Sequence, residues 1–464
     1  MQVNDGRHTG RIAVLLTAAV CGIATVAQAQ FTPIDSFLPP EPGVFDHFGT
    51  DVAIFGDRLL VSAPSDDDVA PDAGVAFLFD ADTGALVRTI TETGLLGTDW
   101  YGYAAAIGPT AAVVTGWGSD VGMGTSGAIY VYDPRTGERI GAYAPSGSEF
   151  GDRFGFSVDI DGELAIVGAS NADGVRLASG AAYVLDLSIP SSIAQLGRLT
   201  ASDGSQGSGF GYAVAIHGDF ALVGAPRDDE KGASSGSAYL YDISDPLRPR
   251  EVAKLTASDG EAFDFFGESV AIHGSVAVIG APDADLPDVS GAGAAYLFDL
   301  SDPANPVEVA VLTDPAGGVL DNFGGHVATD GRVAVVGSPN SDRGVGDSGT
   351  VFVFDAATGS ALTPIRAGTP SFAARFGTGL DLTGGRLAIG APQDGGSGVM
   401  AGAAYLYAAP CAADLDGDGA LTIFDFLEFQ NLFDAGEPAA DFDGDGELTI
   451  FDFLAFQNAF DVGC

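Results

Sequence analysis

Short runs of alternating apolar and polar residues, separated by Gly, Asp or Pro, fill most of this chain. One clear run spans 269–272 and ends at a His-Gly turn, after which 276–282 alternates again. An Asp-rich loop follows, and the segments 294–299 and 308–313 complete a unit of four runs. Alternation with a period of two, broken by turn residues, predicts four short β-strands, and helical spacing is absent from this part of the chain.

An aromatic–glycine step marks each of seven consecutive units. The steps are Phe48-Gly49, Tyr101-Gly102, Phe154-Gly155, Phe210-Gly211, Phe266-Gly267, Phe323-Gly324 and Phe376-Gly377. Successive glycines in these steps lie 53, 53, 56, 56, 57 and 53 residues apart. Four short antiparallel strands in each of seven units predict a mainly β fold, a seven-bladed β-propeller of four-stranded blades over residues 30–409.

The two ends of the repeat region complement each other. The seventh unit stops at residues 404–407 without a fourth strand, whereas 34–38 alternates ahead of the first aromatic–glycine step. We therefore predict that the N-terminal strand at 34–38 completes blade seven, which joins the ends of the ring and removes an open edge.

The units resemble the FG-GAP repeat family in its bacterial form. The resemblance covers roughly residues 46–407 and rests on pairs such as Phe266-Gly267 with Gly280-Ala281-Pro282. Integrin α chains of this family form seven-bladed propellers that bind partners through face loops, some of which hold calcium in a D-x-D-x-D-G pattern. The loops at 66–68, 228–230 and 283–285 lack the Gly turn and the distal carboxylate. We therefore expect solvated acidic loops there rather than further calcium sites.

Units two and three depart from the Gly-Ala-Pro pattern. Trp117-Gly118 and Ala169-Ser170 take the place of Ala-Pro. Trp117 lies at a strand-to-loop junction, where an indole either stacks on a sugar ring of a ligand or packs against the adjacent blade.

Two Asp-rich loops follow the repeats, and each runs into the same apolar helix. D-L-D-G-D-G-A-L-T-I-F-D starts at residue 414 and D-F-D-G-D-G-E-L-T-I-F-D at 441. Calcium takes six to eight oxygens from such a loop: carboxylates at positions 1, 3, 5 and 12, a carbonyl at 7 and a water-mediated ligand at 9. The predicted ligands of two Ca²⁺ ions are Asp414, Asp416, Asp418, Ala420, Thr422 and Asp425, then Asp441, Asp443, Asp445, Glu447, Thr449 and Asp452.

Residues 411–464 resemble a dockerin, of the Gly-Cys-terminated type of planctomycete-like bacteria. The loops end in Asp rather than Glu, lack an obvious preceding helix, share Phe-Asp-Phe-Leu-x-Phe-Gln-Asn and finish at Gly463-Cys464. The resemblance implies calcium-dependent binding to a cohesin-like protein on a scaffold or cell surface. Carried over from the family, the partner-binding residues are loop positions 10 and 11: Ile423, Phe424, Ile450 and Phe451.

The helices after the loops are apolar on every side. A module of 54 residues has too little core to bury two such helices, so we expect some aromatics to face outward and form an interface. Tight packing of both helices is the alternative. Because Leu-Thr-Ile-Phe-Asp-Phe-Leu recurs unchanged, we expect an internal two-fold symmetry that lets the module engage one partner in two orientations.

The N-terminus has the features of an export signal. Arg7 and Arg11 precede a short apolar stretch, and Ala27-Gln28-Ala29 has the small-x-small pattern of a cleavage site. We predict a signal peptide at 1–29 and a secreted, cell-surface-associated protein without membrane insertion, with an uncleaved anchor as the alternative. In an oxidising compartment, Cys411 and Cys464 at the two ends of the small module predict one disulfide.

The charge of −44 at pH 7 argues against nucleic acid as a partner. The five histidines do not cluster, and neither a nucleophile elbow nor a phosphate loop appears. We expect a non-catalytic binding or adhesion protein whose propeller recognises a glycan or an extracellular protein. The alternatives are a polysaccharide lyase or hydrolase delivered by the dockerin-like module, and a structural surface protein.

Overall fold

The computed structural model describes residues 31–67, 70–97, 99–119, 126–286, 289–343, 345–395, 400–409, 413, 415, 422–437, 440, 442 and 448–462. The predicted signal peptide at 1–29 and the predicted disulfide between Cys411 and Cys464 lie outside these residues.

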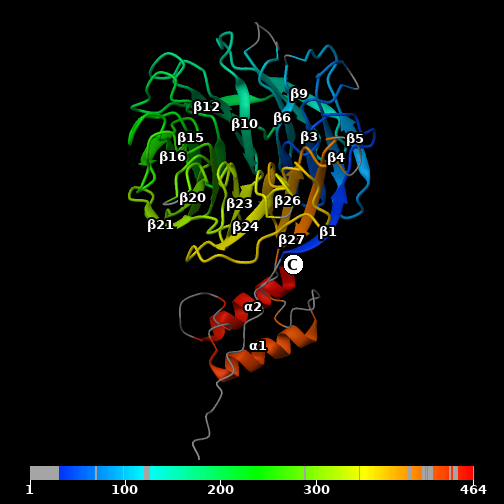
Figure 1. Cartoon of the computed structure of the whole chain (residues 1–464), viewed down its shortest axis with the longest axis vertical. Helices are drawn as coiled ribbons and strands as arrows, with labels where there is room; N and C mark the ends of the chain where they lie inside the picture. The colour runs from blue at the N-terminus through cyan, green and yellow to red at the C-terminus, as the bar shows by residue number, and fades with distance from the viewer. Residues whose placement is uncertain are drawn as a thin grey trace, which may run out of the picture.

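Seven β-sheets follow one another around a ring, which confirms the predicted seven-bladed propeller (Figure 1). The first five blades are antiparallel sheets of four strands in sequence order. Their strands are β2 (Val52–Phe55), β3 (Arg58–Ala63), β4 (Val75–Asp80) and β5 (Leu86–Ile90); β6 (Tyr101–Ile107), β7 (Ala112–Gly116), β8 (Ala128–Tyr132) and β9 (Arg139–Tyr143); β10 (Phe154–Asp161), β11 (Leu164–Ala169), β12 (Ala181–Asp186) and β13 (Ala194–Leu199); β14 (Val214–His217), β15 (Phe220–Ala225), β16 (Ser237–Asp242) and β17 (Arg250–Leu255); β18 (Ser269–His273), β19 (Val276–Ala281), β20 (Ala294–Asp299) and β21 (Val307–Leu312).

Blade six departs from the prediction of four strands. It contains β22 (His326–Thr329), β23 (Val333–Ser338) and β24 (Thr350–Asp355), and its outer edge has only isolated pairings of Ile365 with Val351 and of Ala361 with Phe354. Pro364 lies between these two pairings and has no backbone N–H to donate, so a regular fourth strand is interrupted there.

Blade seven is built from both ends of the repeat region. It contains β25 (Leu380–Thr383), β26 (Arg386–Ala391) and β27 (Ala403–Ala408), and β1 (Thr32–Phe37) forms its outer strand. β1 pairs antiparallel with β27 from Thr32–Ala408 to Phe37–Ala404. Figure 1 shows the blue β1 beside the orange β27. The strand runs from 32 to 37, two residues earlier at its start than the sequence pattern suggested, and it covers the edge of β27.

The aromatic–glycine steps hold neighbouring blades together. All seven aromatic rings are fully buried, and Phe210 packs edge-on against Tyr239, with ring centroids 5.5 Å apart. The Phe210 amide donates to the Ser179 carbonyl of the preceding blade (3.1 Å). The glycine of each step has a positive φ, for example 90° at Gly267, a conformation that side chains disfavour.

The Gly-Ala-Pro segment meets the aromatic–glycine step of the next blade. A Cβ at Gly280 would overlap the carbonyl oxygen of Gly324, and one at Gly224 would overlap that of Gly267. The second strands are consequently buried on both faces, as in β19, whereas the outer β21 is largely exposed. Each blade thus packs against two neighbours, and the first strands contact one another around the whole ring.

Two helices follow the propeller, α1 (Ile423–Ala435) and α2 (Ile450–Val462), each of 13 residues. No helix in the described part of the chain is long and apolar enough to cross a membrane.

The glycine contact predicts a large steric effect at Gly280. Replacing Gly280 by Ala should lower the free energy of unfolding by about 3 kcal/mol, because the added methyl group meets rigid backbone of the next blade. Chemical denaturation followed by far-UV circular dichroism measures this change. Gly368→Ala is the matched control, since nothing lies within 4 Å of a Cβ there and its φ is not positive. Equal effects of the two substitutions would contradict the steric role.

Candidate functional site

The residue before each aromatic–glycine step projects from one end of the ring. Six of these seven residues have a left-handed backbone although they are not glycine: His47, Trp100, Arg153, Phe265, Asn322 and Arg375. The residue after the step lies within the first strand of its blade or one or two residues before it, so both positions surround the ring axis at the same end. We call this end of the propeller the FG end.

Aromatic side chains from blades two, three and four meet at the FG end. Trp100 and Trp117 stack with ring centroids 5.4 Å apart and an interplanar angle of 16°. Tyr103 packs edge-on against Trp117 at 5.9 Å and lies 5.1 Å from Phe156, which in turn lies 4.8 Å from Tyr212. The five rings therefore form a continuous surface across three blades.

Two arginines lie over this aromatic surface. The Arg153 guanidinium is 5.1 Å from the Trp117 ring centroid and 5.9 Å from that of Phe156, and the Arg227 guanidinium is 5.9 Å from that of Tyr212. Such placements are cation–π contacts. We call the set the aromatic–arginine patch; it comprises Trp100, Tyr103, Trp117, Arg153, Phe156, Tyr212 and Arg227.

Trp117, singled out from the sequence, is a half-buried member of this patch. It contacts Arg153 and Phe156 of blade three, which is the inter-blade packing that the sequence allowed. Its Nε1 is buried and has no hydrogen-bond partner in the described part of the chain, whereas Trp100 is 41% exposed. The sequence analysis missed the other members. A comparison of the residue after each step would have found Tyr103, Phe156 and Tyr212, because this position is aromatic only in units two to four.

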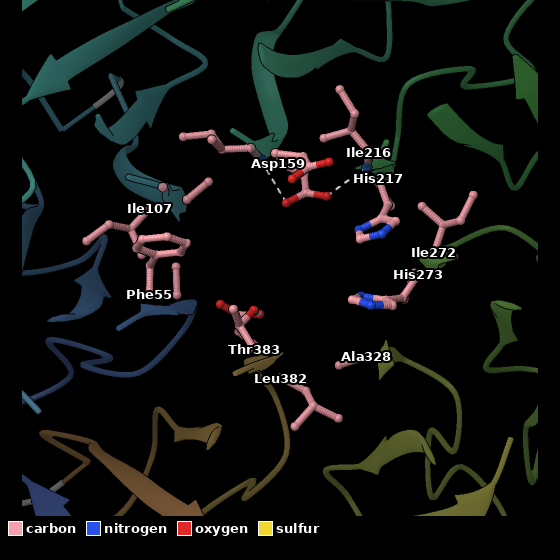
Figure 2. A pocket seen from close by; sticks show the side chains of 18 of the residues that line it. Phe55, Ile107, Asp159, Ile216, His217, Ile272, His273, Ala328, Leu382 and Thr383 are labelled. Carbon is pink, nitrogen blue, oxygen red and sulfur yellow. Dashed lines mark hydrogen bonds between the residues drawn. The ribbon is translucent and has the colours of Figure 1, made fainter. Parts of the chain in front are cut away.

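A second candidate site is the channel along the ring axis. It is a cavity of about 400 Å³ lined by the first strands of all seven blades. Figure 2 shows side chains from these strands pointing into it, with Asp159 on one side and the rings of His217 and His273 side by side. These two rings have centroids 3.9 Å apart. Within the described ranges, no three His, Cys, Asp or Glu side chains are arranged to hold a metal ion.

Three aspartates of the channel wall accept hydrogen bonds from the next blade. The Ala105 amide donates to Asp51 (2.8 Å), that of Ile216 to Asp159 (2.8 Å) and that of Ile54 to Asp381 (2.6 Å). These half-buried carboxyl groups have many protein atoms around them in the channel wall, and the resulting desolvation raises the pKa to about 7 for Asp51 and Asp159 and about 6 for Asp381. The hydrogen bonds that these aspartates accept therefore link neighbouring blades.

The two C-terminal helices pack through residues that are 27 positions apart in the duplicated units. The Phe429 and Phe456 rings are buried and stack with centroids 4.4 Å apart, and Phe426 and Phe453 meet edge-on at 5.9 Å. Because each pair consists of equivalent residues, the helix pair has an approximate two-fold axis between these rings.

The residues at loop positions 10 and 11 lie on the outside of the helix pair. Ile423, Phe424, Ile450 and Phe451 are each 63% exposed, so the two units present the same apolar surface. An apolar groove of about 400 Å³ between the helices is lined by residues that include Phe426, Phe433 and Ile450.

Four of the twelve predicted calcium ligands belong to the described residues. Thr422 caps α1, and its hydroxyl accepts a hydrogen bond from the Phe424 amide (3.1 Å); Thr449 does the same for Phe451. Asp425 and Asp452, at position 12, are fully buried. The predicted ligands outside the described residues are Asp414, Asp416, Asp418, Ala420, Asp441, Asp443, Asp445 and Glu447.

The raised pKa of Asp159 predicts a pH-dependent contribution to stability. Its folded pKa of about 7 exceeds the unfolded value of about 3.9, so the stability that protonated Asp159 provides is lost as pH rises toward 7. Asp159→Ala should therefore destabilise the protein more at pH 5 than at pH 8, with a difference of roughly 1–2 kcal/mol because channel water screens the charge.

Denaturation midpoints across this pH range measure the effect. Asp159→Asn, which keeps an acceptor but does not ionise, should show the same pH trend with a smaller loss. A stability difference that does not change with pH would contradict the burial of this carboxyl group.

The FG-GAP repeat family matches five segments of the chain, which together make up just over half of it: residues 35–79, 143–185, 193–241, 249–298 and 306–354. Each segment begins near the outer strand of one sheet and ends in the third strand of the next; 193–241, for example, runs from β13 to β16. No curated protein matches the chain. The repeat pattern and the seven-bladed ring agree, and the chain belongs to the FG-GAP repeat family.

Proposed function

We propose that this is a secreted, non-catalytic binding or adhesion protein. Its propeller recognises a glycan or an extracellular protein, and its C-terminal helix pair attaches it, in a calcium-dependent manner, to a cohesin-like partner on a scaffold or cell surface. The observation that carries the attachment is the matched exposure of Ile423, Phe424, Ile450 and Phe451, because exposed apolar side chains in duplicate are expensive in water unless a partner covers them.

Calcium fits the described part of the two loops. The Asp452 carboxylate accepts hydrogen bonds from the Thr449 amide (2.6 Å) and from the Phe442 amide (2.8 Å), which belongs to the second residue of the same loop. The position-12 side chain thus reaches back over its own loop, where the other carboxylates of the pattern would gather around an ion. Oxygen donors alone, without Cys or His, are the ligands that Ca²⁺ prefers.

The channel carboxylates support a binding role over a catalytic one. Asp159 accepts from the amides of Ile216 and Ile160 (2.8 Å each), and Asp381 accepts from that of Ile54. These carboxylates are occupied in holding blades together. The patch at the FG end instead offers exposed aromatic area and guanidinium groups, which suit ligand recognition.

The attachment is tested by retention of cell-surface proteins from the source organism on the immobilised full chain. We expect one protein to be retained in millimolar calcium and released by a chelator, because the loops order around the ion. Retention that is unaffected by the chelator would contradict calcium-dependent attachment.

The internal symmetry predicts the effect of single and double substitutions on this retained partner. Phe424→Ala or Phe451→Ala alone should weaken binding only about twofold, because one of two equivalent orientations remains. The double variant should lose about a hundredfold or more, since each orientation then lacks its aromatic anchor. Phe150→Ala, which removes an exposed aromatic from the propeller, is the matched control. Complete loss of binding in either single variant would contradict the two-orientation mode.

A further inference from the structure

Blade two concentrates the unusual side chains of the propeller. Trp100 and Trp117 are the two tryptophans of the whole chain, and both belong to the patch. The unit that carries them lies between the FG-GAP matches 35–79 and 143–185. The ring itself is built without an indole in the six other units, so the stacked pair serves something other than ring closure.

The patch also contains packing features that are unfavourable in free energy for the protein alone. The Trp117 Nε1–H is buried and has no hydrogen-bond partner among the described residues, and leaving such a donor unpaired costs free energy. Trp100 is 41% exposed. A buried unpaired donor next to exposed aromatic area is typical of a binding surface.

The charge of the patch is opposite to that of the molecule. The chain carries 63 acidic and 19 basic residues, yet no carboxylate of the described residues lies within 4 Å of the Arg153 or Arg227 guanidinium. Glu268 is the acidic neighbour of Arg227, and burial raises its pKa to about 7, so it does not neutralise that arginine fully near neutral pH. Two guanidinium groups therefore flank the aromatic surface without a direct ion pair to a described carboxylate, and Arg227 has Glu268 as a more distant acidic neighbour.

The exposed indole and the two guanidinium groups together favour one class of ligand. The flat face of an indole packs against the C–H face of a pyranose ring, and a guanidinium group binds a carboxylate through two parallel hydrogen bonds. Resting on the proposed role as a binding protein, we propose that the aromatic–arginine patch binds a polysaccharide that contains uronic acid, with one pyranose ring on Trp100 and carboxylates of other units of the same chain at Arg153 and Arg227.

The two tryptophans make this site directly observable. Selectively excited tryptophan fluorescence of the full chain reports on the patch, because both indoles belong to it. We expect a saturable change in emission on titration with trimers of galacturonic or glucuronic acid at physiological ionic strength, where charges farther than about 8 Å are screened. The matching neutral galactose and glucose trimers should bind at least about tenfold more weakly, because they lack the carboxylate that the guanidinium groups recognise.

Substitutions at equivalent repeat positions separate the patch from a general charge effect. Arg153→Gln and Arg227→Gln should each weaken binding of the acidic trimer about tenfold or more. Arg375→Gln is the matched control, since Arg375 occupies the same repeat position with nearly the same backbone (φ 56° against 59°), but the residue after its step is Thr378 and not an aromatic residue. Trp100→Ala should weaken binding while the Trp117 signal and the circular dichroism spectrum persist.

Several outcomes would overturn the inference. These are equal affinity for acidic and neutral trimers, equal effects of Arg153→Gln and Arg375→Gln, absence of any response to the acidic trimers, and preferential binding of an acidic peptide. Release of the retained cell-surface protein by a chelator, and its loss in the Phe424 and Phe451 double variant, test the proposed attachment independently of these results.

Discussion

Contact between the backbones of neighbouring blades is the constraint on which the propeller depends. The glycine of one Gly-Ala-Pro segment lies against the carbonyl of the next aromatic–glycine step, as Gly280 does against Gly324. Neither position has room for a side chain, and the glycine of the step also needs a positive φ. The buried aromatic ring beside it then fills the space between the blades, so the two motifs of each repeat form a single joint.

The same joint explains why one end of the ring can vary. The glycine and the aromatic ring determine the conformation of each step. The residues before and after the step can therefore differ between blades without affecting the closure of the ring. Blades two to four use these positions for Trp100, Tyr103, Phe156 and Tyr212, whereas blade six has Gly325 after its step. The patch is therefore an addition to a frame that other residues already hold.

Much of the fold can be predicted from the sequence because each repeat has the same pattern of strands and turns. The period of alternation, the spacing of the seven steps and the spare strand before Phe48 lead to a closed seven-bladed ring. The interrupted edge of blade six does not follow from the repeat, because Pro364 is a local departure from it. The candidate site was predicted less well. Trp117 stands out alone in the sequence, but its neighbours Arg153 and Arg227 come from other blades, and only the closed ring brings them together.

The pairing of β1 with β27 has a consequence for how the protein is made. The strand that emerges first from the ribosome waits for a partner that emerges near the end of the propeller, from Thr32 to Ala408. Joining segments so far apart carries a loop-closure entropy of roughly 5 kcal/mol, and non-local pairing of this kind slows folding. Until β1 pairs with β27, the unpaired edges of these strands can associate with other chains. The strong negative charge of the chain makes partly folded copies repel one another, which suits a ring that closes only at the end of folding.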